Sequence, residues 1–183
     1  GSTDIPLNDT GREQAAEAAE RLRDRLVGSG PVVVASSDLL RAHETAQIIA
    51  TALGAAEPRT YTALRERGYG EAEGIDISEF RHRWGDWYSA DIPGAEPWPV
   101  LRTRAVTGLR TAVHDARRPI ARAVASALRA AESPTGEPLV AVRVTVVAHG
   151  LDPALIHERL ADAPGSPDED ARVRILPFAD GIA

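Results

Sequence analysis

The spacing of apolar residues along the chain predicts helices and strands in alternation. After residues at 8–10 that can cap a helix, alanines and leucines recur three or four positions apart, which predicts a helix ending near Gly28. The apolar run at 32–35 predicts a strand that is covered on both faces. A second helical pattern covers 37–53 and ends at Gly54, a residue type that commonly follows a helix C-terminus.

The second half of the chain continues this alternation. Residues 58–64 predict a short edge strand, and residues 100–131 predict a long helical stretch that Pro119 should break or bend. Apolar residues predict a strand over 139–148 that enters the core and a final edge strand over 173–178. We therefore predict an α/β fold, a three-layer sandwich around a mainly parallel sheet with right-handed crossovers.

One segment interrupts the alternation. Residues 75–99 mix proline and glycine with large aromatic side chains, which indicates an excursion that caps the fold rather than a second domain. The 183 residues, 43% of them hydrophobic, can bury one good core, so we predict a single domain over 1–183. Packing within the excursion is favoured over substrate stacking for its tryptophans, which are Trp84, Trp87 and Trp98.

Composition excludes several kinds of chemistry. All 21 basic residues are arginine and cysteine is absent, which excludes a Schiff base, a lysine-type phosphate loop and a thiolate. A net charge of −6 argues against broad nucleic-acid binding. There is no apolar run of membrane-spanning length and no signal-peptide layout, so we expect a cytoplasmic protein without a membrane partner. No residues have metal-ligand spacing, and we expect neither a metal nor a cofactor.

The most informative stretch is 36–46, which reads Ser-Ser-Asp-Leu-Leu-Arg-Ala-His-Glu-Thr-Ala. It follows the first predicted strand and places Arg41 in the first turn of the next helix. Backbone N–H groups at a helix start, together with a guanidinium that grips two oxygens at once, favour an oxyanion or phosphate site. The alternative is ordinary helix capping by Ser36, Ser37 or Asp38 beside a solvated arginine.

Three further motifs accompany this stretch. They are Asp-Ile-Pro-Leu-Asn-Asp-Thr-Gly-Arg-Glu-Gln-Ala at 4–15, Leu-Arg-Glu-Arg-Gly-Tyr-Gly-Glu-Ala-Glu-Gly at 64–74, and Val-Val-Ala-His-Gly at 146–150. In this order the four motifs resemble the phosphoglycerate-mutase-like branch of the histidine phosphatase superfamily, over about residues 1–178. The resemblance implies a phosphoglycerate-mutase-like fold and hydrolysis of a small-molecule phosphomonoester through a phosphohistidine. Mutases of the family are usually longer, so phosphatase activity is favoured.

The resemblance also implies roles for individual residues. Arg41 matches a phosphate-pocket arginine, and His149 matches the second pocket histidine, which binds phosphate and stabilises developing charge. Ser36, Arg41 and His149 all lie just past predicted strand ends. Because sites in such sheets form beyond the carboxyl ends of the strands, these three residues can converge on one substrate phosphate.

A carboxylic acid completes the implied site. Glu66 matches the acid that protonates the leaving oxygen, a role in which the carboxyl group must hold a proton, as partial burial favours. Glu71 or Glu73 could serve in its place. His43 should not share a phosphate with Arg41, because side chains two residues apart on a helix diverge. The histidines without a matching context are expected at the surface or in helix packing; they are His43, His82, His114 and His157.

The family's name-giving motif, Arg-His-Gly with the nucleophilic histidine, does not occur in the 183 residues. In relatives it precedes the segment that resembles 4–15, where this chain has only residues 1–3. We favour a chain lacking its natural N-terminus. The alternative is a non-catalytic phosphate-binding or scaffold member, and Asp152 near the phosphate site mildly supports that alternative. Activity as an enzyme therefore stays open. A sheet without that strand would expose edges, which another strand or a partner chain, as in a homodimer, should cover.

Overall fold

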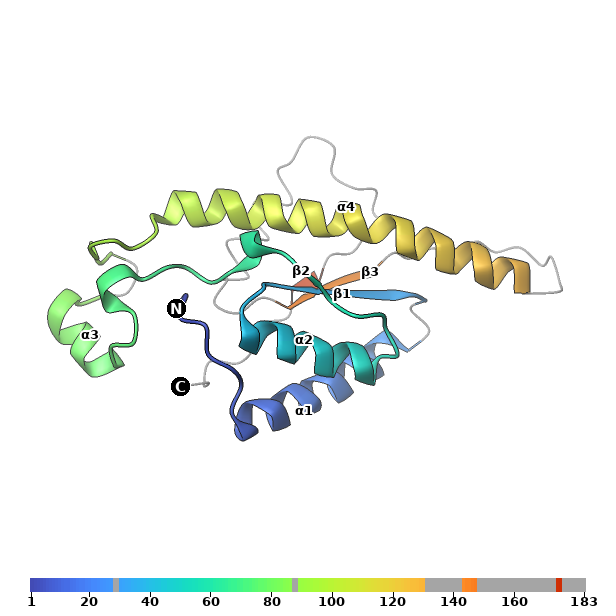
Figure 1. Ribbon diagram of the computed structural model, residues 1–183, viewed down its shortest axis with the longest axis horizontal. Helices are drawn as coiled ribbons and strands as arrows, with labels where there is room; N and C mark the ends of the chain where they lie inside the picture. Colours follow the sequence, from blue (N-terminus) through green and yellow to red (C-terminus); the bar gives the residue numbers. More distant parts are fainter. Residues whose placement is uncertain (28–29, 87–88, 131–142, 148–173, 176–183) are drawn as a thin grey trace.

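The computed structural model describes residues 1–27, 30–86, 89–130, 143–147 and 174–175 (Figure 1). The described strands form a parallel sheet in the order β2-β1-β3-β4. Helix α4 contacts β1 and β3 from one side, and α2 contacts the same strands from the other, with α1 packed against α2 (Figure 1). These layers confirm the predicted α/β sandwich with a parallel sheet.

The strands lie where the apolar pattern predicted them. The first strand extends one residue beyond its predicted end at 35. The predicted strand over 58–64 is wrong at its second half, because only Arg59–Thr60 form a strand and Thr62–Leu64 form a 3₁₀ helix. The remaining parts of 139–148 and 173–178 lie outside the described residues. The first strand and the short second strand pair in parallel, with Ser36 opposite Thr60. The strands are β1 Val32–Ser36, β2 Arg59–Thr60, β3 Arg143–Val147 and β4 Arg174–Ile175.

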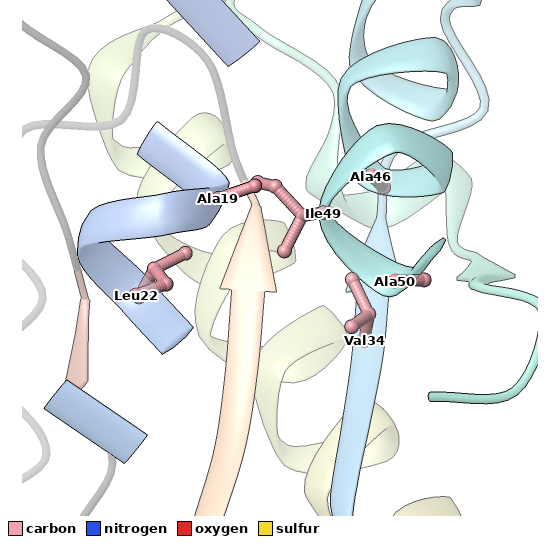
Figure 2. Packing of buried hydrophobic residues seen from close by; sticks show 6 residues of the cluster. All are labelled: Ala19, Leu22, Val34, Ala46, Ile49 and Ala50. Atoms are coloured by element: carbon pink, nitrogen blue, oxygen red, sulfur yellow. The ribbon is translucent and has the colours of Figure 1, made fainter. Parts of the chain in front are cut away.

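The core between α1 (Asp9–Leu26), α2 (Leu40–Ala52) and β1 contains many small side chains (Figure 2). Alanines at the contact let two helices approach closely, because the distance between helix axes depends on the side chains there. Larger apolar side chains fill the space between the helices and the strand. The buried cluster comprises Ala19, Leu22, Val34, Ala46, Ile49 and Ala50.

The two helices begin differently. Asn8 caps α1, since its side chain accepts a hydrogen bond from the Gly11 N–H at 2.8 Å, which confirms a cap within 8–10. The predicted start of α2 at residue 37 is wrong, because this helix begins at Leu40. Its first free N–H, that of Leu40, donates to the Asp4 carboxylate at 2.7 Å, so the cap comes from 36 residues away.

Helix α4 (Trp98–Ala130) is one continuous helix of 33 residues that bends gently in Figure 1. Pro119 therefore does not divide the stretch into two helices, the other arrangement that the sequence allowed. Proline lacks the N–H that would bond the carbonyl four residues earlier, at Asp115. That carbonyl instead accepts a hydrogen bond from Arg59 Nη1 at 3.3 Å, which compensates for the missing donor.

The excursion over 75–99 contains α3 (Ile77–Trp84) and a small apolar cluster of its own. Trp84 packs against Phe80 with 5.4 Å between ring centroids, and the Trp98 ring lies 4.2 Å from the Arg67 guanidinium carbon. Both tryptophans therefore pack against the protein, as predicted. Gly28 and Trp87 lie outside the described residues.

Candidate functional site

Ser36 lies at the carboxyl end of β1, at the edge of the sheet where parallel strands place their sites. It is fully buried, and its Oγ has no hydrogen-bond partner within the described part of the chain. Its partner on β3 is Val147, the last described residue of that strand. His149 follows two positions later in the sequence and lies outside the described residues.

Arg41 lies in the first turn of α2, close behind Ser36 in the sequence. Its side chain is only 13% exposed and is held by three acceptors. Nη1 donates to the Thr3 carbonyl at 2.8 Å, while Nη2 donates to the Gly1 carbonyl at 2.5 Å and to Glu66 Oε2 at 3.0 Å. This geometry differs from the solvated arginine of the capping alternative.

Glu66 follows a short 3₁₀ helix, Thr62–Leu64, and its side chain is 16% exposed. Oε2 contacts Arg41 and also lies 2.9 Å from the amino group of Gly1. The loop that carries Glu66 is fixed to the start of α2 by Arg65, which donates to both oxygens of Asp38 at 2.6 and 2.7 Å. These bonds from Arg65 hold the pKa of Asp38 below its usual value.

The two alternative glutamates lie differently. Glu71 is exposed, whereas Glu73 accepts hydrogen bonds from the backbone N–H groups of Ser2 and Tyr69, both at 2.8 Å. The hydroxyls of Ser2 and Thr3 also donate to Glu73, at 3.0 and 3.1 Å. Burial opposes ionisation of this carboxyl, but the hydrogen bonds outweigh it and lower the pKa of Glu73 to about 2. Glu73 therefore holds the segment whose carbonyls contact Arg41.

The described histidines lie apart from this arrangement. His43 Nε2 is 3.7 Å from the Glu57 carboxylate, so this side chain and that of Arg41 have different partners, in agreement with the expected divergence. His82 and His114 are exposed, and His157 lies outside the described residues. Within the described residues no three histidine, aspartate, glutamate or cysteine side chains are grouped to hold a metal ion.

Sequence reasoning singled out Ser36, Arg41 and Glu66, and the structure places the last two in direct contact. It missed the carbonyl of Thr3 and the cap from Asp4. A backbone acceptor carries no side-chain signature, and a contact between residues more than 35 positions apart leaves no local pattern.

None of the described helices is both long and apolar enough to cross a membrane.

The geometry is that of an arginine and a carboxylate converging at the carboxyl edge of a parallel sheet. The family model of the histidine phosphatase superfamily (branch 1) matches residues 1–166. The chain therefore belongs to the histidine phosphatase superfamily, as its motifs predicted.

Similar proteins include phosphatases and mutase-like proteins. The chain is 41% identical over 119 residues to phosphoglycerate mutase-like protein 4 of Arabidopsis thaliana. The matched region covers 60% of this chain and 50% of the relative. It is 33% identical over 171 residues to glucosyl-3-phosphoglycerate phosphatase of Mycobacterium tuberculosis, covering 90% of this chain and 70% of that protein. It thus spans about half the length of several curated relatives.

Solved structures agree with the fold. The structure of mycobacterial glucosyl-3-phosphoglycerate phosphatase matches with a TM-score of 0.60 and 27% identity, covering 91% of this chain and 74% of that chain. The same mycobacterial enzyme in complex with inorganic phosphate matches with a TM-score of 0.58.

Proposed function

We propose that Arg41 and Glu66 belong to the phosphate-binding site of a histidine-type phosphatase that hydrolyses a small phosphomonoester. The observation that carries the proposal is the nearly buried guanidinium of Arg41, 3.0 Å from the Glu66 carboxylate, at the carboxyl edge of the sheet. A buried arginine in this position can bind two phosphate oxygens. The similarity to a mycobacterial phosphatase solved with inorganic phosphate supports the choice of ligand.

Each residue has a defined role in the proposed reaction. Arg41, with Ser36 and His149, binds the phosphoryl oxygens and stabilises their charge. A histidine nitrogen attacks phosphorus as the bond to the ester oxygen breaks, and the Glu66 carboxyl group gives that oxygen its proton. Water then attacks the phosphohistidine, loses a proton to the Glu66 carboxylate and releases inorganic phosphate. This sequence returns every group to its starting state.

The nucleophile distinguishes two versions of this proposal. None of the five histidines stands in an Arg-His-Gly motif, so the attacking nitrogen is not assigned to any of the 183 residues. The second candidate is a member of the family that binds a phosphomonoester without hydrolysing it, which is supported by Asp152, an anionic residue three positions after His149 in the sequence. Both versions require the same Arg41 pocket and differ only in turnover.

Turnover of p-nitrophenyl phosphate separates them. If the protein is a hydrolase, Arg41→Gln should lower kcat/KM by roughly 100-fold, because one preorganised donor to the phosphoryl oxygens is lost. His149→Ala should lower it by a similar factor. Arg59→Gln is the matched control, since Arg59 is exposed and its guanidinium bonds the Asp115 carbonyl on α4 rather than Glu66.

The outcomes sort the candidates. Turnover lost in both site variants but kept in Arg59→Gln supports the hydrolase. Binding of phosphate without turnover by the parent protein supports the Arg41 phosphate site but not hydrolysis by these 183 residues. Turnover that is unchanged in Arg41→Gln contradicts both versions.

A further inference from the structure

Arg104, on α4, uses all five of its N–H donors within the described structure. Nε and Nη2 donate to the two carboxylate oxygens of Glu96 at 2.6 and 2.7 Å. Nη1 donates to the carbonyls of Ala63 at 3.1 Å and Arg65 at 2.6 Å, and Nη2 also donates to the Glu66 carbonyl at 2.8 Å. Five donors in a fixed plane are a property of arginine alone among side chains.

This arrangement fixes Glu66 at two points. Arg104 holds its main-chain carbonyl, and Arg41 holds its carboxylate 3.0 Å away. The residues after the 3₁₀ helix belong to no described helix or strand until Gly70, so regular secondary structure supplies no donors to their carbonyls. The side chain of Arg104 provides them instead, and it is itself oriented by the bidentate bond to Glu96.

Glu96 also joins the end of the excursion to the Glu66 loop. Its N–H donates to the Gly68 carbonyl at 2.8 Å, and its carbonyl accepts from Arg67 Nε at 2.8 Å. Gly70 brings the two backbones together at φ +54°, where a Cβ atom would lie 2.2 Å from the Pro93 carbonyl oxygen. The excursion, the loop and α4 therefore meet at the Arg104–Glu96 pair.

We propose that Arg104 is a positioning residue for Glu66: held by Glu96, it sets where the Glu66 carboxylate lies relative to Arg41. The inference rests on the proposed function, in which that carboxylate faces the substrate phosphate. A lysine at 104 keeps the charge but has three donors and no planar fork, so it cannot reproduce the five bonds.

Calorimetric titration with inorganic phosphate tests the proposal in a double-mutant cycle. Glu66→Gln removes a negative charge that competes for Arg41, so phosphate Kd should fall roughly threefold. Arg104→Lys should lower Kd by a similar factor, because Glu66 is released from Arg41. In the Glu66→Gln background, Arg104→Lys should change Kd hardly at all, since the residue it positions is already neutral. Arg59→Lys is the control, because it replaces arginine by lysine at another residue that bonds to α4.

Each result has one meaning. A change in Kd from Arg104→Lys that is equal in both backgrounds overturns the positioning role, because the residue then acts only on the fold. A phosphate Kd that is the same in Glu66→Gln and the parent also overturns the positioning role. In that case, phosphate binding by the parent still supports the proposed function. A parent protein that does not bind phosphate overturns the proposed function and the inference together. If circular dichroism shows Arg104→Lys unfolded, Glu96→Gln replaces it in the same cycle with the same expected coupling.

Discussion

Hydrogen bonds from the first residues of the chain determine the protonation of Glu73. Its carboxylate accepts from Ser2, Thr3 and Tyr69, and these donors favour the charged form more strongly than burial opposes it. The carboxylate in turn fixes the backbone whose carbonyls accept from Arg41. A change in the charge of Glu73 therefore affects the surroundings of Arg41 without direct contact between the two side chains.

Glu73 should make stability fall in acid. Its pKa is lowered from 4.5 to about 2 in the folded protein, so its stabilisation is present above pH 4.5 and is lost as pH falls toward 2. We expect about 1 kcal/mol, since solvent screens a partly exposed carboxylate. Urea unfolding at pH 6 and pH 3 measures the loss. Glu73→Gln should show a smaller loss than the parent, and an equal loss in both proteins would contradict the account.

At the scale of single residues, the sequence indicates candidate side chains better than it indicates the groups to which they bond. Arg41 was identified because a motif and a predicted helix start coincide on it. Arg104 was not, because three of its acceptors are carbonyls about 40 residues earlier in the chain and no local pattern marks them. The partners of the three glutamates in one short motif also needed the structure: Glu66 contacts Arg41, whereas Glu73 accepts from Ser2 and Tyr69.

The elements of the fold follow from periodicity, but their ends depend on distant contacts. The apolar pattern located α1, β1 and α4, whereas it placed the start of α2 three residues too early. Two of the three residues that the capping alternative named have other roles: Ser36 is the end of β1, and Asp38 binds Arg65. The cap from Asp4 could not be predicted without knowing how the opening segment lies on α2.

Loss of the Asp4 cap should destabilise α2. Asp4→Ala removes the acceptor for the Leu40 N–H, and we expect the free energy of unfolding to fall by about 1 kcal/mol. Asp4→Asn keeps an oxygen acceptor and should lose less than half as much. Urea denaturation at neutral pH measures both variants. Equal losses would show that the charge of Asp4, rather than its hydrogen bond, supports the helix.

Pro119 is the corresponding weak point of α4. Pro119→Ala restores an N–H that can bond the Asp115 carbonyl, and should raise the free energy of unfolding by about 1 kcal/mol. The increase is smaller than the usual cost of an interior proline because Arg59 already bonds that carbonyl. Pro99→Ala is the control, since Pro99 lies in the first turn, where its missing N–H costs nothing. A larger gain from Pro99→Ala would contradict this explanation.

For the whole molecule, the parallel sheet decides where chemistry can occur. Helices lie on both sides of the sheet, so the carboxyl ends of its strands remain the place where polar side chains from separate segments meet. Ser36 ends β1, Arg41 lies in the first turn of α2, and Glu66 follows the 3₁₀ helix after β2. Alternation of helices and strands was sufficient to predict this architecture, whereas membership of the histidine phosphatase superfamily depended on four motifs in order.

The most direct test of the central claim is a calorimetric titration of the protein and of Arg41→Gln with inorganic phosphate. We expect the parent to bind phosphate and Arg41→Gln to weaken that binding by at least tenfold, because a nearly buried guanidinium is replaced by a neutral amide. Arg59→Gln should bind as the parent does. Equal phosphate affinity in Arg41→Gln and the parent would contradict the claim that Arg41 forms the phosphate site.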